Sequence, residues 1–134
     1  MSGPDPSFWQ HKRVLLTGHT GFKGAWLALW LQQLGAEVHG LALPPDPDQT
    51  LFPALGLQLS EDRIDLRDQQ AVQRSVLQAQ PQIVLHLAAQ PLVRRSYADP
   101  VGTWSTNVLG SLHLLEALKP LTHPCAVVMV TTDK

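Results

Sequence analysis

A glycine-rich loop between an apolar run and a helical segment constrains the fold of this chain most strongly. Residues 17–24 read Thr-Gly-His-Thr-Gly-Phe-Lys-Gly, after an apolar run at 14–16. Glycines at 18, 21 and 24 permit a tight turn, close approach of a pyrophosphate and close packing of a helix on a sheet. Free N–H groups at the helix start would face the phosphates. The G-x-x-G-x-x-G spacing alone also fits ordinary turns, but the flanking strand and helix favour a dinucleotide site.

Composition excludes several classes of partner. The 134 residues suffice for one domain, with 44% apolar and 16% charged residues. A net charge of -1 argues against nucleic acid or an anionic membrane as partner. Cys125 is the only cysteine, which excludes an intrachain disulfide. Its position beside an apolar strand favours a buried, inert thiol over a reactive one. No signal peptide or membrane-spanning run is visible, so we expect a soluble, cytoplasmic protein.

Strand-like and helical segments alternate along the chain. The predicted strands are Arg13–Thr17, Glu37–Leu43, Arg63–Leu66, Ile83–Leu87 and Ala126–Val130. The predicted helices are Gly21–Leu34, stopped by Gly35, a short turn at Thr50–Gly56, a helix capped by Asp68 that runs to Gln80, and Pro100–Lys119. In the first helix, Trp26, Leu27, Trp30, Leu31 and Leu34 recur at helical spacing, which predicts core packing.

This alternation predicts an α/β fold with a doubly wound parallel sheet of the Rossmann type. We expect residues 1–12 to be an N-terminal tail and residues 13–134 to form the dinucleotide-binding domain. The chain stops just after its fifth predicted strand. We therefore expect an incomplete domain whose remaining strands and substrate domain are absent.

Ligands of such sheets bind outside the carboxyl ends of the strands, and four segments reach that edge. The residues predicted to contact a cofactor there are Gly18, His19, Thr20, Gly21, Phe22, Lys23, Gly24, Asp65, Leu66, Ala88, Ala89 and Gln90. The fourth segment, at the end of the fifth strand, is Thr131-Thr132-Asp133-Lys134. Lys23 also fits a solvated position, and structural hydrogen bonding is the favoured role of His19 and His86.

Together these segments resemble the extended short-chain dehydrogenase/reductase family from Lys12 onward. The resemblance implies that Asp65 binds the adenine amino group, although a helix or turn cap is the alternative for this residue. It also implies that Ala88 and Ala89 let the backbone lie along the cofactor, and that Asn107 holds the local backbone.

Within that family, three segments are similar to the CDP-glucose 4,6-dehydratases. They are the glycine loop extended to Leu27, the run Ala-Ala-Gln-Pro-Leu-Val-Arg-Arg-Ser-Tyr at 88–97, and Thr-Asp-Lys at 132–134. Thymidine-nucleotide relatives typically carry Thr-Asp-Glu where this chain ends in Lys134. They also replace Gln90 and Leu92 with an acid and a histidine. Lys134 is therefore the most discriminating residue.

The resemblance implies an enzyme that converts CDP-glucose to CDP-4-keto-6-deoxyglucose. Hydride leaves C4 for NAD, water is eliminated across C5 and C6, and hydride returns to C6. Thr132 would bond the hydroxyl that is oxidised, and Asp133 would protonate the leaving hydroxyl. Lys134 would either take the C5 proton, which requires a pKa far below about 10.4, or stabilise the enolate while another group takes it.

The chain departs from the family pattern in lacking the Tyr-x-x-x-Lys pair, on which C4 oxidation depends in this family. The only tyrosine is Tyr97, and Val101 stands four residues later. We expect the pair to lie beyond residue 134 and the 134-residue chain alone to be inactive.

The expectation of NAD rather than NADP depends on which charged residues are missing near the second predicted strand. No acid stands in register at the end of the second strand, where Asp46 is only a weak candidate for the ribose. No lysine or arginine occurs between Val38 and Asp62 to pair with the 2′-phosphate of NADP, so NAD is favoured. Gln90, Arg94 and Arg95 are candidate substrate contacts, and the arginines suit a diphosphate, although a solvated pair fits equally. The histidines show no ligand spacing, so we assign no metal.

Two other functions remain open. A different nucleotide-sugar dehydratase or an epimerase of the same family fits all but Lys134 and the 90–95 segment. A non-catalytic NAD-binding module would fit if the longer protein lacked Tyr-x-x-x-Lys. Resemblance also implies a homodimer built through the helix at Pro100–Lys119.

Overall fold

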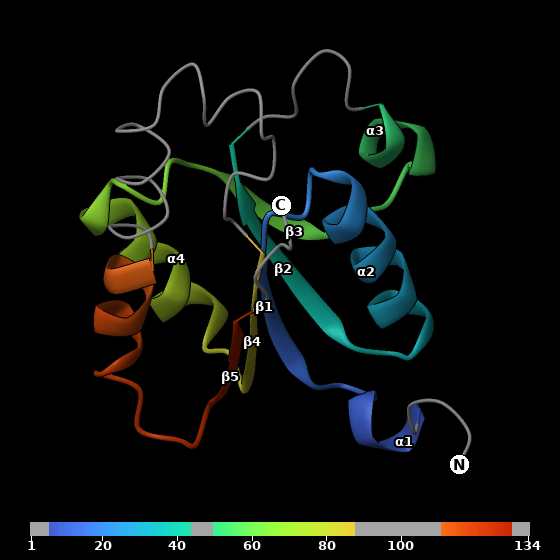
Figure 1. Ribbon diagram of the computed structural model, residues 1–134. Coiled ribbons are helices and arrows are strands. Elements are labelled where there is room, and N and C mark those ends of the chain that lie inside the picture. The colour runs from blue at the N-terminus through green and yellow to red at the C-terminus, as the bar shows by residue number, and fades with distance from the viewer. Residues whose placement is uncertain (1–5, 44–49, 88–110, 130–134) are drawn as a thin grey trace.

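A single parallel sheet organises the molecule (Figure 1). The computed structural model describes residues 6–43, 50–87 and 111–129. The sheet has five strands in the order β3-β2-β1-β4-β5, every neighbouring pair parallel. The strands are β1 (Arg13–Thr17), β2 (Glu37–Ala42), β3 (Ser60–Arg63), β4 (Ile83–His86) and β5 (Ala126–Met129). The predicted doubly wound α/β fold is confirmed.

Helices cover both faces of the sheet (Figure 1). The helices α2 (Phe22–Gln33) and α3 (Leu51–Leu55) lie on one face, and α4 (Gln69–Ala79) and the helical residues 111–118 lie on the other. Alternate residues of β1 serve the two layers, with Val14 and Leu16 packing toward α2 and Leu15 toward α4. A short helix, α1 (Pro6–Trp9), lies in the segment that we expected to be a tail.

The predicted ends of the helices agree with the structure. Gly35, just past α2, adopts φ +88°. Asp68 caps α4 by accepting a hydrogen bond from the Ala71 N–H at 3.2 Å. Gln80 ends that helix in the left-handed region, at φ 47°. The start of the predicted helix Pro100–Lys119 lies outside the described residues.

The predicted position of the third strand was wrong by three residues. The strand is Ser60–Arg63, in register from His39 opposite Ser60 to Ala42 opposite Arg63. The apolar Ile64 and Leu66 suggested a strand further along the chain. Instead β3 is polar because it lies at the edge of the sheet, while Leu66 enters the core after the strand has ended.

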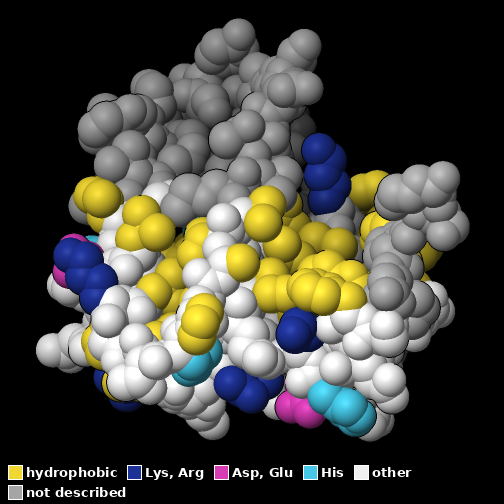
Figure 2. Space-filling model, turned by 90° about the horizontal axis from the view of Figure 1, so that it is seen from below, with side chains coloured by type: hydrophobic (Ala, Val, Ile, Leu, Met, Phe, Trp, Pro, Cys, Tyr) yellow, Lys and Arg dark blue, Asp and Glu magenta, His cyan; other side chains and the backbone are white. Residues whose placement is uncertain are grey.

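The predicted core packing of the first helix was wrong for its two tryptophans and is confirmed for Leu31. Trp26 and Trp30 are 47% and 48% exposed, whereas the buried residues of α2 are Gly24, Ala25, Ala28 and Leu31. Small residues let the helix lie close to the sheet, which turns the large rings outward. Hydrophobic side chains also gather on the face seen from below in Figure 2.

Candidate cofactor site at the carboxyl ends of β1, β2 and β3

The glycine loop has no room for side chains at two of its glycines. Gly18 adopts φ +80°, and a Cβ there would lie 2.6 Å from the Leu87 carbonyl oxygen. A Cβ on Gly24 would collide with the backbone of Gly18 and His19. The loop therefore holds the start of α2 directly against the end of β1. In dinucleotide-binding folds the third glycine of the loop allows this close packing of helix on strand, and the helix start then lies beside the pyrophosphate.

The start of α2 is open to an anion. Gly21 is the N-cap residue, and the structure shows no side-chain cap hydrogen bond there. The N–H of Ala25 is bonded to the Gly21 carbonyl at 2.8 Å, so the N–H groups that lack a partner within the helix belong to the turn before it. Phe22 and Lys23 are exposed on this turn. The residues present thus fit the phosphates of a dinucleotide.

His19 is committed to the interior of the fold. Its side chain is 0% exposed, with Nε2 2.6 Å from the Glu61 carboxylate and the ring edge-on to Phe52. A Cβ on Gly40 would lie 2.6 Å from that ring, so glycine makes space for it. Burial lowers the pKa of His19, although Glu61 opposes the shift. Neutral His19 therefore donates from Nε2 to Glu61, a structural hydrogen bond.

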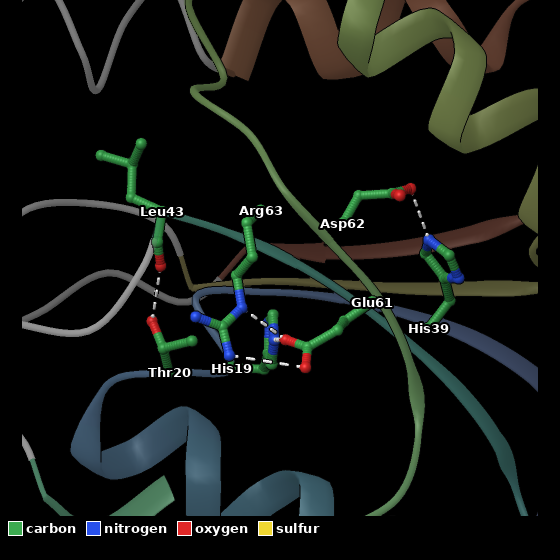
Figure 3. Close-up of polar contacts among 7 residues, drawn as sticks. All are labelled: His19, Thr20, His39, Leu43, Glu61, Asp62 and Arg63. Atoms are coloured by element: carbon green, nitrogen blue, oxygen red, sulfur yellow. Dashed lines mark hydrogen bonds and ion pairs between the residues drawn. The ribbon is translucent and has the colours of Figure 1, made fainter. Parts of the chain in front are cut away.

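The next residue ties the loop to β2. Thr20 is buried, and its hydroxyl donates to the Leu43 carbonyl at 3.0 Å (Figure 3). This bond holds the glycine loop beside the end of β2, where the adenosine ribose lies in folds of this type.

Two residues of β3 that the sequence did not indicate, Glu61 and Arg63, lie beside the junction of the glycine loop and the end of β2. Arg63 lies opposite Ala42 in the sheet and donates from Nε to Glu61 at 2.7 Å. Its guanidinium lies 5.8 Å from the centre of the Phe52 ring. Glu61 and Arg63 point to the same side of β3, whereas Asp62 points to the other (Figure 3). Only correct placement of the strand puts Arg63 opposite the end of β2.

Asp65 makes the turn that follows β3. Its carboxylate accepts hydrogen bonds from the backbone N–H and the guanidinium of Arg67, at 2.9 and 2.7 Å. These bonds lower the pKa of Asp65. The turn-cap alternative thus describes this residue in the structure, and its adenine contact stays a prediction. Leu66 is buried in the core, and its carbonyl lies 2.8 Å from His113 Nδ1.

A second buried cluster joins β1, β4 and the helical residues 111–118. The Thr17 hydroxyl lies 2.7 Å from His86 Nδ1, and it accepts the N–H of Leu87 at 2.8 Å. His86 Nε2 lies 3.0 Å from the Ser111 hydroxyl. Burial lowers the pKa of His86. As expected, this histidine is held by structural hydrogen bonds.

The remaining predicted site residues lie outside the described part of the chain. They are Ala88, Ala89, Gln90, Arg94, Arg95, Asn107, Thr132, Asp133 and Lys134, together with Asp46. Within residues 6–43, 50–87 and 111–129, no cluster of three or more His, Cys, Asp or Glu side chains is arranged to hold a metal ion. Across those same ranges, no helix has the length and apolar character needed to cross a membrane.

Known proteins are similar to this chain in both sequence and fold. The chain is 51% identical over 132 residues to CDP-glucose 4,6-dehydratase from Salmonella typhimurium, a match that covers 97% of this chain and 37% of that protein. The chain thus spans little more than a third of the length of this relative.

Solved structures of epimerases have a similar fold. A putative epimerase from Burkholderia cenocepacia is 32% identical with a TM-score of 0.73, covering 92% of this chain and 38% of that one. The UDP-glucose 4-epimerase of Thermus thermophilus, solved with NAD, is 35% identical with a TM-score of 0.68, covering 79% and 33%. These matches confirm the resemblance to extended short-chain dehydrogenases/reductases. The family model of GDP-mannose 4,6 dehydratase matches residues 15–134, and the chain belongs to this family.

Proposed function

We propose that this chain is the dinucleotide-binding part of an NAD-dependent enzyme that converts CDP-glucose to CDP-4-keto-6-deoxyglucose. The observation that carries the proposal is the glycine loop, whose Gly18 and Gly24 leave no room for a side chain and present the uncapped start of α2. The identity of 51% to a CDP-glucose 4,6-dehydratase supports the reaction and the substrate.

The described residues divide the work of holding NAD. The turn at Gly21–Gly24 takes the pyrophosphate, and Thr20 fixes that turn to the end of β2. Asp65 and Leu66 stand beyond the end of β3, where the adenine is expected. When bound, NAD accepts a hydride from the sugar and later returns it.

The acid–base steps belong to the last three residues in this proposal. Thr132 bonds the C4 hydroxyl, and Asp133 gives a proton to the oxygen that leaves C6. Lys134 either removes the proton from C5 or stabilises the negative charge that forms there. Gln90, Arg94 and Arg95 contact the nucleotide sugar, with the arginines on its diphosphate. We further propose that the longer protein is a cytoplasmic homodimer and that it supplies the Tyr-x-x-x-Lys pair.

A second candidate is a nucleotide-sugar 4-epimerase. The observation that favours it is the fold shared with UDP-glucose 4-epimerase, at 35% identity and with NAD bound in that structure. An epimerase also binds NAD in this fold, but it releases a product of the same mass as its substrate. If the longer protein had no Tyr-x-x-x-Lys pair, a non-catalytic NAD-binding module would be the remaining function.

The decisive test offers the full-length protein and NAD four substrates separately: CDP-, dTDP-, GDP- and UDP-glucose. Mass spectrometry then follows each nucleotide sugar. We expect the mass of the CDP compound alone to fall by one water. Unchanged masses with saturable NAD binding would contradict the dehydratase, and an altered sugar configuration at constant mass would establish the epimerase.

A further inference from the structure

The end of β3 carries a charged pair next to the expected position of the adenosine ribose. Glu61 accepts from His19 and from Arg63 Nε through the same oxygen, Oε1, at 2.6 and 2.7 Å. Its other oxygen, Oε2, has a longer contact of 3.4 Å with Arg63 Nη2. Oε2 therefore keeps capacity to accept a further hydrogen bond. The side chains of Glu61 and Arg63 are 29% and 37% exposed, so a ligand can reach both.

The position of this pair follows from the sheet. Glu61 and Arg63 lie opposite Gly40 and Ala42 of β2 and share one face of β3 (Figure 3). Thr20 of the glycine loop is bonded to Leu43, the residue after Ala42. A dinucleotide whose pyrophosphate lies on the glycine loop would direct its adenosine ribose toward this junction.

The charges of Glu61 and Arg63 balance one another, and His19 beside them is neutral. Burial keeps His19 neutral by lowering its pKa. Burial alone would raise the pKa of Glu61, but hydrogen bonds from Arg63 and His19 hold it below its ordinary value. The negative Glu61 thus compensates the positive Arg63. A 2′-phosphate needs a cation that is not already compensated, whereas a neutral 2′-hydroxyl needs an acceptor.

We propose that Glu61 and Arg63 set the preference of this protein for NAD over NADP. Glu61 supplies from β3 the carboxylate that folds of this type usually supply from the end of β2. Its Oε2 accepts the 2′-hydroxyl of NAD. Arg63 is held by Glu61 and is therefore withheld from a 2′-phosphate. The inference rests on the proposed NAD site, and it adds which residues read the ribose.

Calorimetric titration of the full-length protein with NAD and with NADP tests this directly, because binding is measured without turnover. Glu61→Gln keeps an acceptor for His19 but removes the negative charge that compensates Arg63. We expect the affinity for NADP relative to NAD to rise about tenfold or more, the size of one good charge-assisted contact. Arg63→Met leaves Glu61 uncompensated, so the same ratio should fall below that of the unmodified protein.

Two further variants serve as controls in this titration. Glu116→Gln makes the same chemical change in the exposed pair of Glu116 with Lys119, at 2.8 Å, and should leave the ratio unchanged. The double variant Glu61→Gln/Arg63→Met should lose the NADP gain of the single variant. Thermal melting confirms which variants are folded, and Arg63→Met decides the matter if Glu61→Gln does not fold.

The outcomes separate this inference from the proposed function. Opposite shifts of the ratio in the two single variants support it. An unmoved ratio in folded variants that still bind NAD overturns it and leaves the proposed function intact. If the unmodified protein binds neither dinucleotide, both this inference and the proposed function are contradicted. If it binds NADP as tightly as NAD, the assigned role of Glu61 is contradicted.

Discussion

Two hydrogen-bonded clusters flank the carboxyl end of β1, and they differ in charge. The β3-side cluster, formed by His19, Glu61 and Arg63, has an ion pair at its outer end that is partly exposed. The β4-side cluster, formed by Thr17, His86 and Ser111, contains a hydroxyl, a neutral imidazole and a second hydroxyl. Both use a buried histidine, yet only one places a carboxylate and a guanidinium within reach of a ligand.

The difference indicates a division of roles. Neutral groups that satisfy one another inside a fold stabilise it without a large desolvation penalty. Charged groups are better tolerated where they remain partly solvated, and there they can also meet a ligand. The β4-side cluster therefore fixes the position of strand ends, whereas the outer part of the β3-side cluster is available for recognition.

The largest loss of stability should follow Thr17→Val in the β4-side cluster. The change removes the hydroxyl that pairs with buried His86 Nδ1 and that accepts the shorter of two hydrogen bonds from the Leu87 N–H, which keeps only its 3.2 Å contact with the Thr17 carbonyl. We expect unfolding in urea to show a loss of about 3 kcal/mol. Thr17→Ser, which keeps the hydroxyl, should retain most of the stability. A loss below about 1 kcal/mol in the valine variant would contradict a structural role for this cluster.

Gly40→Ala should act next most strongly, on the β3-side cluster. The new Cβ would lie 2.6 Å from the His19 ring, which Glu61 and Phe52 hold in place. We expect a loss of about 2 kcal/mol from this overpacking, measured by urea unfolding. Gly56 is the matched control, because nothing lies within 4 Å of a Cβ there. Gly56→Asn suits its φ of 61° and should be nearly neutral. Equal losses at both glycines would exclude the His19 contact as the cause.

Acid should weaken both clusters through their histidines. Burial lowers the pKa of His19 and of His86 below 6.5, the ordinary value. Each therefore contributes stability that is fully present above about pH 6.5, where the unfolded chain is also neutral, and that is lost as the pH falls through the folded-state pKa. Each histidine can add up to about 1.4 kcal/mol per pH unit to the slope. Urea unfolding between pH 5 and 7 should show a shallower slope for His86→Gln, and an identical slope would contradict a buried neutral His86.

The smallest effect on stability should come from Arg63→Met, the change that most alters dinucleotide choice. Arg63 is 37% exposed in its pair with Glu61, and such pairs contribute about 1 kcal/mol or less. Methionine loses the guanidinium, which lies 5.8 Å from the centre of the Phe52 ring, but it can place an apolar side chain there instead. A loss of several kcal/mol in thermal or urea unfolding would show that the pair is structural, like the β4-side cluster.

Much of the fold could be predicted because local signals agreed with it. The strand Arg13–Thr17, the helix that follows and the cap at Asp68 all come from short apolar runs, glycines and a capping residue. The third strand could not be located this way. Its residues, Ser60 to Arg63, are polar and are held by pairing with β2, a long-range contact that leaves no local pattern.

The site was predictable in part for the same reason. Glycines placed between an apolar run and a helix indicate a tight turn, so the close backbone packing at Gly18 and Gly24 could be predicted. Glu61 and Arg63 could not, because their relevance arises only when β3 is placed beside Gly40 and Ala42. Arg63 follows directly after the stretch from Val38 to Asp62, which contains no lysine or arginine.

A crystal structure of the full-length protein with NAD tests the central claim most directly, since it shows where each part of the dinucleotide lies. The proposed NAD site predicts the pyrophosphate on the turn at Gly21–Gly24, and the 2′-hydroxyl of the adenosine within about 3 Å of Glu61 Oε2. It also predicts that Thr17, His86 and Ser111 keep their mutual hydrogen bonds and do not touch the ribose. An adenosine ribose turned away from β3, or a pyrophosphate bound elsewhere than the start of α2, would contradict it.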